Sequence, residues 1–389
     1  QPAHQVSRRS FLSTSTALGT AAVLGPTRLT SAAPPAKVIE TRVISPQSAY
    51  YHGWPTVARR SSGQLLLAWS GGREAHVCPF GRLDFMTSDD DGRTWTWPRT
   101  LQDSAIDDRD AGVLETKAGT ILVTTFTSLA YAPTLARAKA GAAGWPAERL
   151  AAWNAVHHRL PEQDRKADLG EWMLRSTDNG RTWSARYPTI VNSPHGPIQL
   201  SDGRLLYAGR ELWTDAKRVG VCQSTDDGQT WEWLAQIPAR DGDNPASYHE
   251  LHAVQAGDGR IIVHIRNHNK TNERETLQTE SDDGGRTWSV PHPIGVWGLP
   301  SHLLRLPNDT LLMTYGHRRP PFGNQARLST DGGRTWSDPM MISTDGPGGD
   351  LGYPSTVELG DGTLLTVWYE VMKGSSKAVL RQARWTVRQ

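Results

Sequence analysis

Six short segments of the chain are rich in titratable side chains, and each lies at the start of a predicted β-strand. They combine His, Arg, Asp, Glu and Tyr, which can donate or accept protons, bind anions or act as nucleophiles. Gathering such groups in one place is unfavourable unless they bind a charged or hydroxylated ligand. The segments are 51–54, 107–110, 193–195, 248–252, 297–302 and 350–353.

A repeated turn motif indicates which elements position these segments. The pattern Ser-x-Asp-x-Gly-x-Thr-Trp occurs five times, beginning at Ser88, Ser176, Ser224, Ser281 and Ser329. Asp accepts backbone N–H bonds, Gly adopts an unusual backbone conformation, and Trp anchors the turn to a core. A calcium loop is the alternative, but no Glu closes it at the required distance. We therefore interpret the motif as a folding device that marks one repeated structural unit.

A second periodic feature is a strand that follows a Gly or Asp-Gly turn, and it recurs six times. Its alternating, β-branched and aromatic composition is typical of β-strands. The six strands are predicted at 64–69, 120–126, 204–207, 260–265, 310–315 and 363–369.

Six units of four antiparallel strands predict an all-β fold, a six-bladed β-propeller. Residues 37–44 and 379–387 are expected to share the last blade and close the ring, and this blade lacks the turn motif. The second blade carries an insertion over 128–168 that is expected to be helical, since Pro146 suits a helix start and Leu150, Trp153, His157 and Leu160 share one face.

Strand direction places the titratable segments together. In an antiparallel blade, the start of the first strand and the loop between the second and third strands lie on one face, opposite the turn motifs. These loops add further polar residues to the same face: Arg73, Glu74, His76, Arg210, Glu211, Trp213, Arg266, Asn267, His268, His317, Arg318, Arg319 and Glu370.

The composition is that of an ordinary soluble domain. The 389 residues carry a net charge of +2 without long acidic or basic runs, so neither nucleic-acid binding nor disorder is indicated. The two cysteines, Cys78 and Cys222, form either one bridge or two buried thiols.

The first 36 residues are interpreted as a signal peptide and linker. Ser7–Leu12, with Arg8 and Arg9, followed by an apolar stretch to Leu24 and by Ser31–Ala33, resembles a twin-arginine export signal. The apolar stretch is too short to span a membrane. We expect a periplasmic or extracellular protein with no membrane association once the signal is removed.

The turn motifs, known as Asp boxes, on a six-unit propeller over about residues 37–389 resemble the sialidase superfamily. The resemblance implies a tyrosine nucleophile assisted by a glutamate, a carboxylic general acid and three arginines that bind the substrate carboxylate. Tyr353 matches the nucleophile, Glu250 its partner, Arg266 the second arginine, and Arg318 or Arg319 the third. The alternative is a Tyr353 that packs against the channel, with Glu250 in a structural salt bridge.

Further candidate substrate-binding residues come from the same ring. Asp108, Arg109 and Asp110 resemble the acidic loop of the second blade, with the arginine held between two carboxylates. Arg73 belongs to the first blade. Four histidines are expected at equivalent positions in four blades, namely His52, His195, His252 and His302.

Two departures from the family pattern affect the expected chemistry. Gly53 stands where the family has its first arginine, so the carboxylate clamp is incomplete. The loop 71–80 offers no Asp for the general acid, and His76 is the replacement candidate, with Glu74 behind it. Histidine donates protons near neutral pH, which makes the replacement chemically workable.

We predict no cofactor and no metal, although histidines from separate blades would bind one without leaving a short motif. The leading hypothesis is an exported, exo-acting glycoside hydrolase that removes a terminal, acidic, sialic-acid-like sugar from a glycan or glycoconjugate. A polysaccharide lyase acting on uronates and a non-catalytic carbohydrate-binding propeller are the alternatives.

Overall fold

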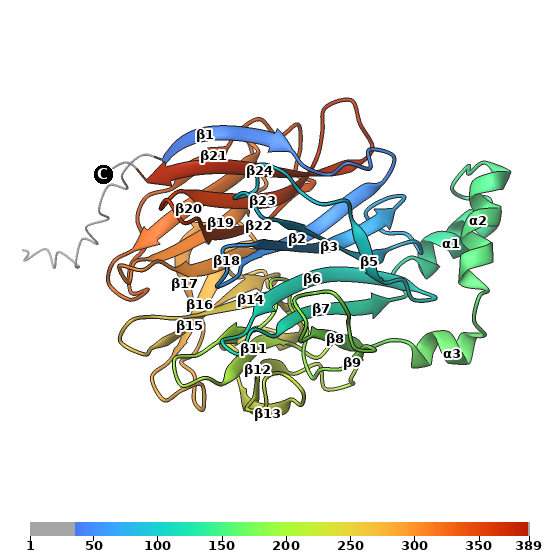
Figure 1. Ribbon diagram of the computed structural model, residues 1–389. Helices are drawn as coiled ribbons and strands as arrows, with labels where there is room; N and C mark the ends of the chain where they lie inside the picture. The colour runs from blue at the N-terminus through green and yellow to red at the C-terminus, as the bar shows by residue number, and fades with distance from the viewer. Residues whose placement is uncertain (1–35, 388–389) are drawn as a thin grey trace, which may run out of the picture.

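Six four-stranded antiparallel sheets form a β-propeller over residues 36–387, which are the residues that the computed structural model describes (Figure 1). The predicted export signal lies outside these residues. The strands are β1 (Ala36–Val43), β2 (Tyr51–Arg59), β3 (Leu65–Arg73), β4 (Arg82–Ser88), β5 (Arg99–Gln102), β6 (Asp107–Glu115), β7 (Ile121–Ser128), β8 (Glu171–Ser176), β9 (Tyr187–Pro188), β10 (Ile198–Gln199), β11 (Leu205–Arg210), β12 (Val219–Ser224), β13 (Glu232–Gln236), β14 (Tyr248–Gln255), β15 (Ile261–Asn267), β16 (Glu275–Ser281), β17 (His292–Trp297), β18 (Ser301–Arg305), β19 (Leu311–His317), β20 (Gly323–Ser329), β21 (Met340–Ser343), β22 (Leu351–Glu358), β23 (Leu364–Val371) and β24 (Ala378–Val387).

Each of the first five blades is a meander of four consecutive strands, from β2–β5 to β18–β21. The sixth has the order β1-β24-β23-β22, so a strand from the start of the described chain completes the blade formed by its end. Pairing of β1 with β24 runs from Ala36 opposite Val387 to Val43 opposite Arg381. The predicted closure is confirmed, and the six predicted strands correspond to β3, β7, β11, β15, β19 and β23.

The Asp boxes are turns between the third and fourth strands of five blades. In the first box, the hydroxyl of Ser88 accepts the N–H of Gly92 at 2.9 Å, and Asp90 accepts the N–H of Thr94 at 2.8 Å. Gly92 has φ +76°, a conformation that favours glycine. Trp95 packs against the core between the first and sixth blades. The turn is closed by the chain's own donors, which supports its interpretation as a folding device.

Three helices lie between β7 and β8 and extend from one side of the propeller (Figure 1). They are α1 (Ala132–Lys139), α2 (Ala147–His157) and α3 (Glu162–Ala167), and a 3₁₀ helix, η1 (Pro245–Ser247), precedes β14. Pro146 is the N-cap residue of α2, and Trp153 on this helix is completely buried.

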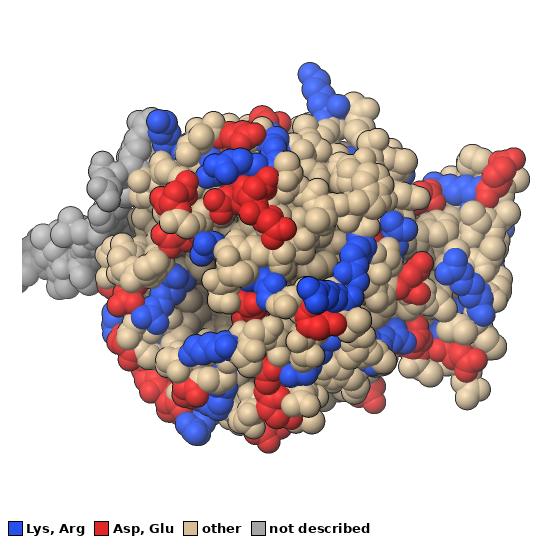
Figure 2. All heavy atoms as spheres, viewed as in Figure 1, with Lys and Arg blue, Asp and Glu red and all other residues tan. Residues whose placement is uncertain are grey.

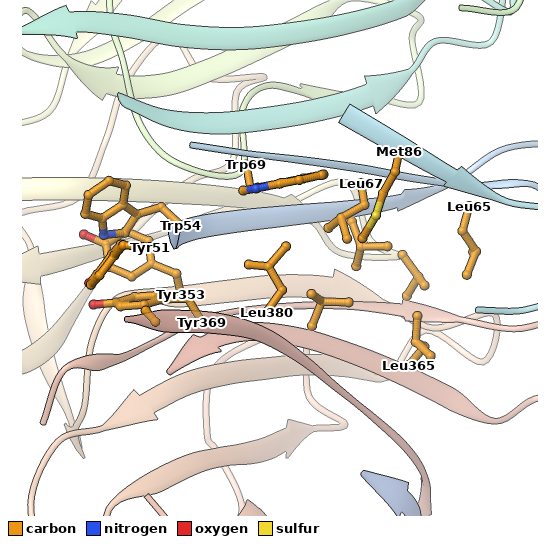
Figure 3. Packing of buried hydrophobic residues seen from close by; sticks show 14 of the residues in the cluster. Tyr51, Trp54, Leu65, Leu67, Trp69, Met86, Tyr353, Leu365, Tyr369 and Leu380 are labelled. Atoms are coloured by element: carbon orange, nitrogen blue, oxygen red, sulfur yellow. The ribbon is translucent and has the colours of Figure 1, made fainter. Parts of the chain in front are cut away.

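The largest core cluster lies between the first and sixth blades and runs from one face of the propeller to the other (Figure 3). Tyr51, Trp54, Tyr353 and Tyr369 gather at one end, whereas Leu65, Met86 and Leu365 lie at the other. The aromatic end contains the predicted nucleophile. The packed core therefore supports the candidate site directly.

Cys78 and Cys222 are both buried free thiols, which decides between the two alternatives left open by the sequence. Within residues 36–387, no helix has the length and apolar character needed to cross a membrane. Figure 2 shows Lys and Arg interspersed with Asp and Glu over the face in view, without a large field of one sign.

Candidate active site

The inner strands of four blades share a bulge that positions the polar residues. Register shifts occur in β2, β6, β14 and β22, and in each bulge one residue has a positive φ. These residues are Trp54 (54°), Asp110 (47°), Glu250 (46°) and Tyr353 (52°). Such a conformation costs a non-glycine residue about 1–3 kcal/mol, and bulges are frequent next to active sites because they redirect side chains.

Tyr353, Glu250 and Arg266 meet at this face, although they come from β22, β14 and β15. The Tyr353 hydroxyl donates a short hydrogen bond to one carboxylate oxygen of Glu250, and Arg266 donates another to the second oxygen. The Arg266 Nη1 atom also lies 3.1 Å from the Tyr353 hydroxyl. The three groups that the family resemblance selected therefore form one connected cluster.

Electrostatics keep the glutamate ionised and the tyrosine neutral. Burial would raise the pKa of Glu250, but the charge and hydrogen bond of Arg266, together with the hydrogen bond from Tyr353, lower this pKa to about 2. Burial, followed by the negative charge of Glu250, raises the pKa of Tyr353 well above its usual value. The resting site is thus a neutral phenol that donates to a carboxylate.

Of the two candidate third arginines, Arg318 is the one beside the tyrosine. Its guanidinium carbon lies 5.6 Å from the centre of the Tyr353 ring, and its Nε atom donates to the carbonyl of Leu351 at 2.8 Å. Arg319 points elsewhere, since its guanidinium stacks on Trp297 at 4.3 Å.

Trp54 packs beside Tyr353 at the same face. Its side chain is 1% exposed, and its ring centre lies 6.3 Å from that of Tyr353. The guanidinium groups of Arg109 and Arg73 lie 4.4 and 4.8 Å from the Trp54 ring. The indole therefore packs between two cations, and this arrangement keeps both close to the site.

These two arginines have different environments. Arg73 is completely buried and forms a two-pronged ion pair with Asp107, at 2.7 and 3.0 Å. It is a positioning residue, not one that reaches a substrate. Arg109 lies 3.5 Å from Asp107 and lines the cavity described below.

We expected Arg109 to be held between the carboxylates of Asp108 and Asp110, but it is not. The carboxylate of Asp108 instead accepts from Gln102 and from the backbone of Ser104, at 2.5 and 2.7 Å. Asp108 precedes the bulge and Asp110 lies within it, so the two carboxylates point in different directions. Asp110 faces the site, and burial raises its pKa to about 7 despite the opposing charge of Arg109.

His76 joins a second hydrogen-bonded cluster, next to the first. Its Nδ1 atom lies 2.8 Å from the hydroxyl of Tyr51 and 3.1 Å from Asp350. Asp350 also accepts from the hydroxyls of Tyr51 and Tyr369, at 3.0 Å each. Burial would raise the pKa of Asp350, but the hydrogen bonds and charge of His76 lower it. The partner of His76 is therefore Asp350, which sequence reasoning did not assign.

Glu74 does not support His76 directly and instead anchors the helical insertion. Its carboxylate accepts the indole N–H of Trp153 at 2.6 Å and pairs with Arg149 at 2.5 Å. Both partners lie on α2. The loop that carries His76 is thereby attached to the insertion.

We expect Glu74→Ala to loosen the insertion. Loss of the acceptor leaves the buried indole N–H of Trp153 unpaired, at a cost of about 1–3 kcal/mol. Limited trypsinolysis after Lys139, the last residue of α1, is expected to accelerate about tenfold. Glu162→Ala, which removes an exposed pair with Lys166 on α3, is the control and should change nothing. Equal cleavage rates for the two variants would contradict the anchoring role.

A cavity of about 460 Å³ opens between these residues, a volume typical of small-ligand sites. His76, Arg109, Asp110 and Glu250 line one side. The remaining lining residues come mainly from the second, third and fourth blades: Phe126, Ser128, Ala130, Asn192, Ser193, Pro194, Arg210, Leu212, Trp213, Lys217 and His249, with Val77 from the first.

The four predicted equivalent histidines do not form a ring around this cavity. His195, His252 and His302 contact one another near the propeller axis, with ring centres 4.6–5.3 Å apart. They line a different cavity of about 570 Å³ that reaches the ends of the inner strands, at Arg59 and Arg305.

His52 is separate from the other three histidines. It is buried within the first blade, where it contacts the carbonyl of Gln47 and accepts from Trp69. The expectation of four equivalent histidines is thus wrong. The axis of the propeller brings three inner strands together, while His52 points into its own blade. Within residues 36–387, no group of three or more His, Cys, Asp or Glu side chains is arranged to hold a metal ion.

The fold and the Tyr353, Glu250 and Arg266 cluster define the class as a sialidase-like six-bladed propeller. The sequence model of the BNR repeat-like domain family matches residues 145–366, and the chain belongs to this family.

Solved structures show the same fold. A protein of unknown function from Dyadobacter fermentans is 23% identical, with a TM-score of 0.73 over 91% of this chain and 100% of that chain. The NanB sialidase from Streptococcus pneumoniae is 15% identical, with a TM-score of 0.62 over 90% of this chain and 70% of that chain. The Trypanosoma rangeli sialidase in complex with sialic acid is 16% identical, with a TM-score of 0.56 over 92% of this chain and 58% of that chain.

A curated relative that the chain matches is the xyloglucanase Xgh74A from Acetivibrio thermocellus. The two are 28% identical over 181 residues, which is 40% of this chain. The match spans only 20% of the xyloglucanase. Together these similarities support a fold of the glycoside hydrolase kind.

Proposed function

We propose that the protein is an exported, exo-acting glycoside hydrolase that removes a terminal acidic, sialic-acid-like sugar from a glycan. The observation that carries this proposal is the hydrogen-bonded cluster of Tyr353, Glu250 and Arg266. A neutral phenol is a suitable nucleophile for an anionic sugar, because it avoids the repulsion that a carboxylate nucleophile would meet.

In the first half of the reaction, the Tyr353 oxygen bonds to the anomeric carbon while its proton passes to Glu250 along the existing hydrogen bond. The bond to the leaving oxygen breaks, and protonated His76 donates a proton to that oxygen. Arg266 and Arg318 bind the substrate carboxylate, a role supported by their positions beside Tyr353.

In the second half, water attacks the anomeric carbon and gives its proton to His76. The bond to Tyr353 breaks, and the phenol oxygen recovers its proton from Glu250. Asp350, 3.1 Å from the Nδ1 atom of His76, orients the imidazole. Each residue returns to its starting state.

A glycan hydrolysis screen read by mass spectrometry tests the proposal. The expected product is a released acidic monosaccharide whose formation requires Tyr353. Binding of sugars without any product would favour the non-catalytic propeller. The appearance of an unsaturated product that absorbs in the ultraviolet would favour the lyase, and either result would overturn the proposal.

The identity of the general acid is tested by leaving-group dependence. His76→Gln is expected to lower kcat/KM about 10²–10⁴-fold on natural glycans. The loss should nearly vanish on a 4-methylumbelliferyl glycoside, because that leaving group needs little protonation. Asp110→Asn is the comparison, since Asp110 lines the same cavity and has a pKa of about 7. If only the Asp110 variant shows this dependence, His76 is not the acid.

A further inference from the structure

Arg210, at the end of β11, carries a charge that no carboxylate neutralises. Within the described part of the chain it forms no ion pair, and its buried Nε atom has no hydrogen-bond partner. One Nη atom donates to the carbonyl of Ala246 at 2.5 Å. A partly buried guanidinium without a counter-charge is unfavourable unless a ligand supplies one.

Neighbouring carboxylates are already engaged. Glu211, the next residue, is buried and pairs with Arg218. Glu171 accepts the backbone N–H of Leu212 at 2.6 Å. Glu250, the one carboxylate whose charge Arg210 feels, is bound to Arg266. Arg210 is therefore free to bind an anion that enters from solvent.

Lys217 gives the same cavity a second unpaired cation. It follows Arg210 on the loop between β11 and β12, and both residues line the 460 Å³ cavity. Over residues 36–387, Lys217 forms no ion pair, and its backbone N–H donates to Thr214 at 3.1 Å. An exposed ammonium and a planar guanidinium that line one cavity suit a tetrahedral or planar anion.

A line of contacts connects Arg210 to the cluster that contains Tyr353. Arg210 lies 3.4 Å from His249, whose ring lies 4.8 Å from that of His268. Arg266 donates to His268 at 2.7 Å. These contacts link Arg210 to Arg266, and Arg210 and Glu250 line the same cavity.

The cavity that Arg210 and Lys217 line also has an aromatic surface. Trp213 is 41% exposed, and its ring centre lies 6.5 Å from that of Phe126. Both line the cavity. Exposed indole faces stack on the apolar faces of sugar rings, so the cavity wall near Arg210 offers a surface for a sugar ring.

We propose that Arg210 and Lys217 bind a sulfate or carboxylate on the sugar next to the scissile bond, so that the substrate is an acidic glycan with two anionic groups. The inference rests on the proposed function. Arg266 and Arg318 bind the first anion, on the terminal sugar, and Arg210 and Lys217 bind the second.

The test measures binding by calorimetry in a Tyr353→Phe background, which prevents turnover. The probes are sialyllactosamine, the same glycan sulfated on its N-acetylglucosamine, and a disialylated form that offers a carboxylate instead. At least one dianionic probe is expected to bind about tenfold more tightly than sialyllactosamine. The dianionic probe that binds more tightly identifies the second anion as a sulfate or a carboxylate.

Arg210→Gln is expected to abolish this difference while leaving the affinity for sialyllactosamine unchanged, and Lys217→Gln should reduce it. Arg218→Gln, on the same loop but paired with Glu211, is the control and should preserve the difference. Circular dichroism and the melting temperature confirm that each variant is folded.

Two outcomes overturn the inference: equal affinity for all three probes, or an Arg210→Gln variant that weakens them all alike. These outcomes are separate from failure of the proposed function. Selective binding without hydrolysis of any glycan by the unmodified protein would sink only the proposed function. Hydrolysis without selective binding would sink only the second anion site.

Discussion

Tyr353→Phe is expected to lower kcat at least about 10³-fold, equivalent to about 4 kcal/mol of transition-state stabilisation. The variant removes one oxygen atom and leaves the ring in place. The ring packs among Trp54, Tyr369 and the Arg318 guanidinium, so the melting temperature should change little. The loss should appear in kcat on every substrate, because substrates with good and with poor leaving groups both require a nucleophile.

Two variants complete this experiment. Tyr315→Phe removes a buried hydroxyl that bonds to Gln325 in the fifth blade, away from the cluster, and should retain full turnover. Glu250→Gln should resemble Tyr353→Phe, since an amide does not accept the phenol proton. Retention of substantial turnover by Tyr353→Phe would show that another group attacks the sugar.

Acid is expected to destabilise the propeller through its axial histidines. Burial lowers the pKa values of His195, His252 and His302 well below the usual value, and neighbouring imidazoles lower them further. Below the unfolded pKa of about 6.5, the unfolded chain binds protons that the native protein does not bind. The stability that these groups contribute is therefore present above pH 6.5 and is lost as the pH falls.

The size of this effect follows from linkage. Each such histidine contributes up to about 1.4 kcal/mol per pH unit, so three contribute up to about 4 kcal/mol at pH 5.5. A typical domain has only about 5–15 kcal/mol in total. Asp108 and Asp110 oppose the trend, because burial raises their pKa values to about 7 and they take up protons in the native state.

Comparing variants isolates the histidine contribution from that of the aspartates. His252→Asn keeps an acceptor for the N–H of Leu303, which the imidazole accepts at 2.9 Å. Urea titrations at pH 7.5 and 5.5 give the free energy of unfolding of the variant and the parent. The decrease between the two pH values should be about 1.4 kcal/mol smaller for His252→Asn than for the parent. The exposed His158→Asn should match the parent. Identical pH dependence of all three proteins would rule out the axial cluster as the cause.

The repeated features were predictable because they depend on local rules. Box turns such as 88–95 need only their own donors and acceptors, and alternating strands such as 260–265 need only an apolar face. Five copies of the box and six of the strand then leave little choice of fold. Tyr353, Glu250 and Arg266 were also selected correctly as neighbours, because strand direction places them on one face.

The partners of individual side chains were not predictable. His76 and Asp350 are 274 positions apart, and nothing in the loop 71–80 points to the sixth blade. Glu74 was assigned to His76 by proximity in sequence, although its carboxylate turns to Trp153. A loop has no fixed period, so its side-chain directions are set by whichever neighbours the closed ring supplies.

The amino-acid sequence by itself determined the number of blades, the closure of the ring and the face that carries the polar residues, since hydrogen bonding and hydrophobic periodicity act over a few residues. Tertiary structure alone decided that Trp54 packs against two arginines, that three histidines meet on the axis and that the buried Nε atom of Arg210 has no hydrogen-bond partner. Those outcomes depend on distances between blades, which are fixed only when all six pack together.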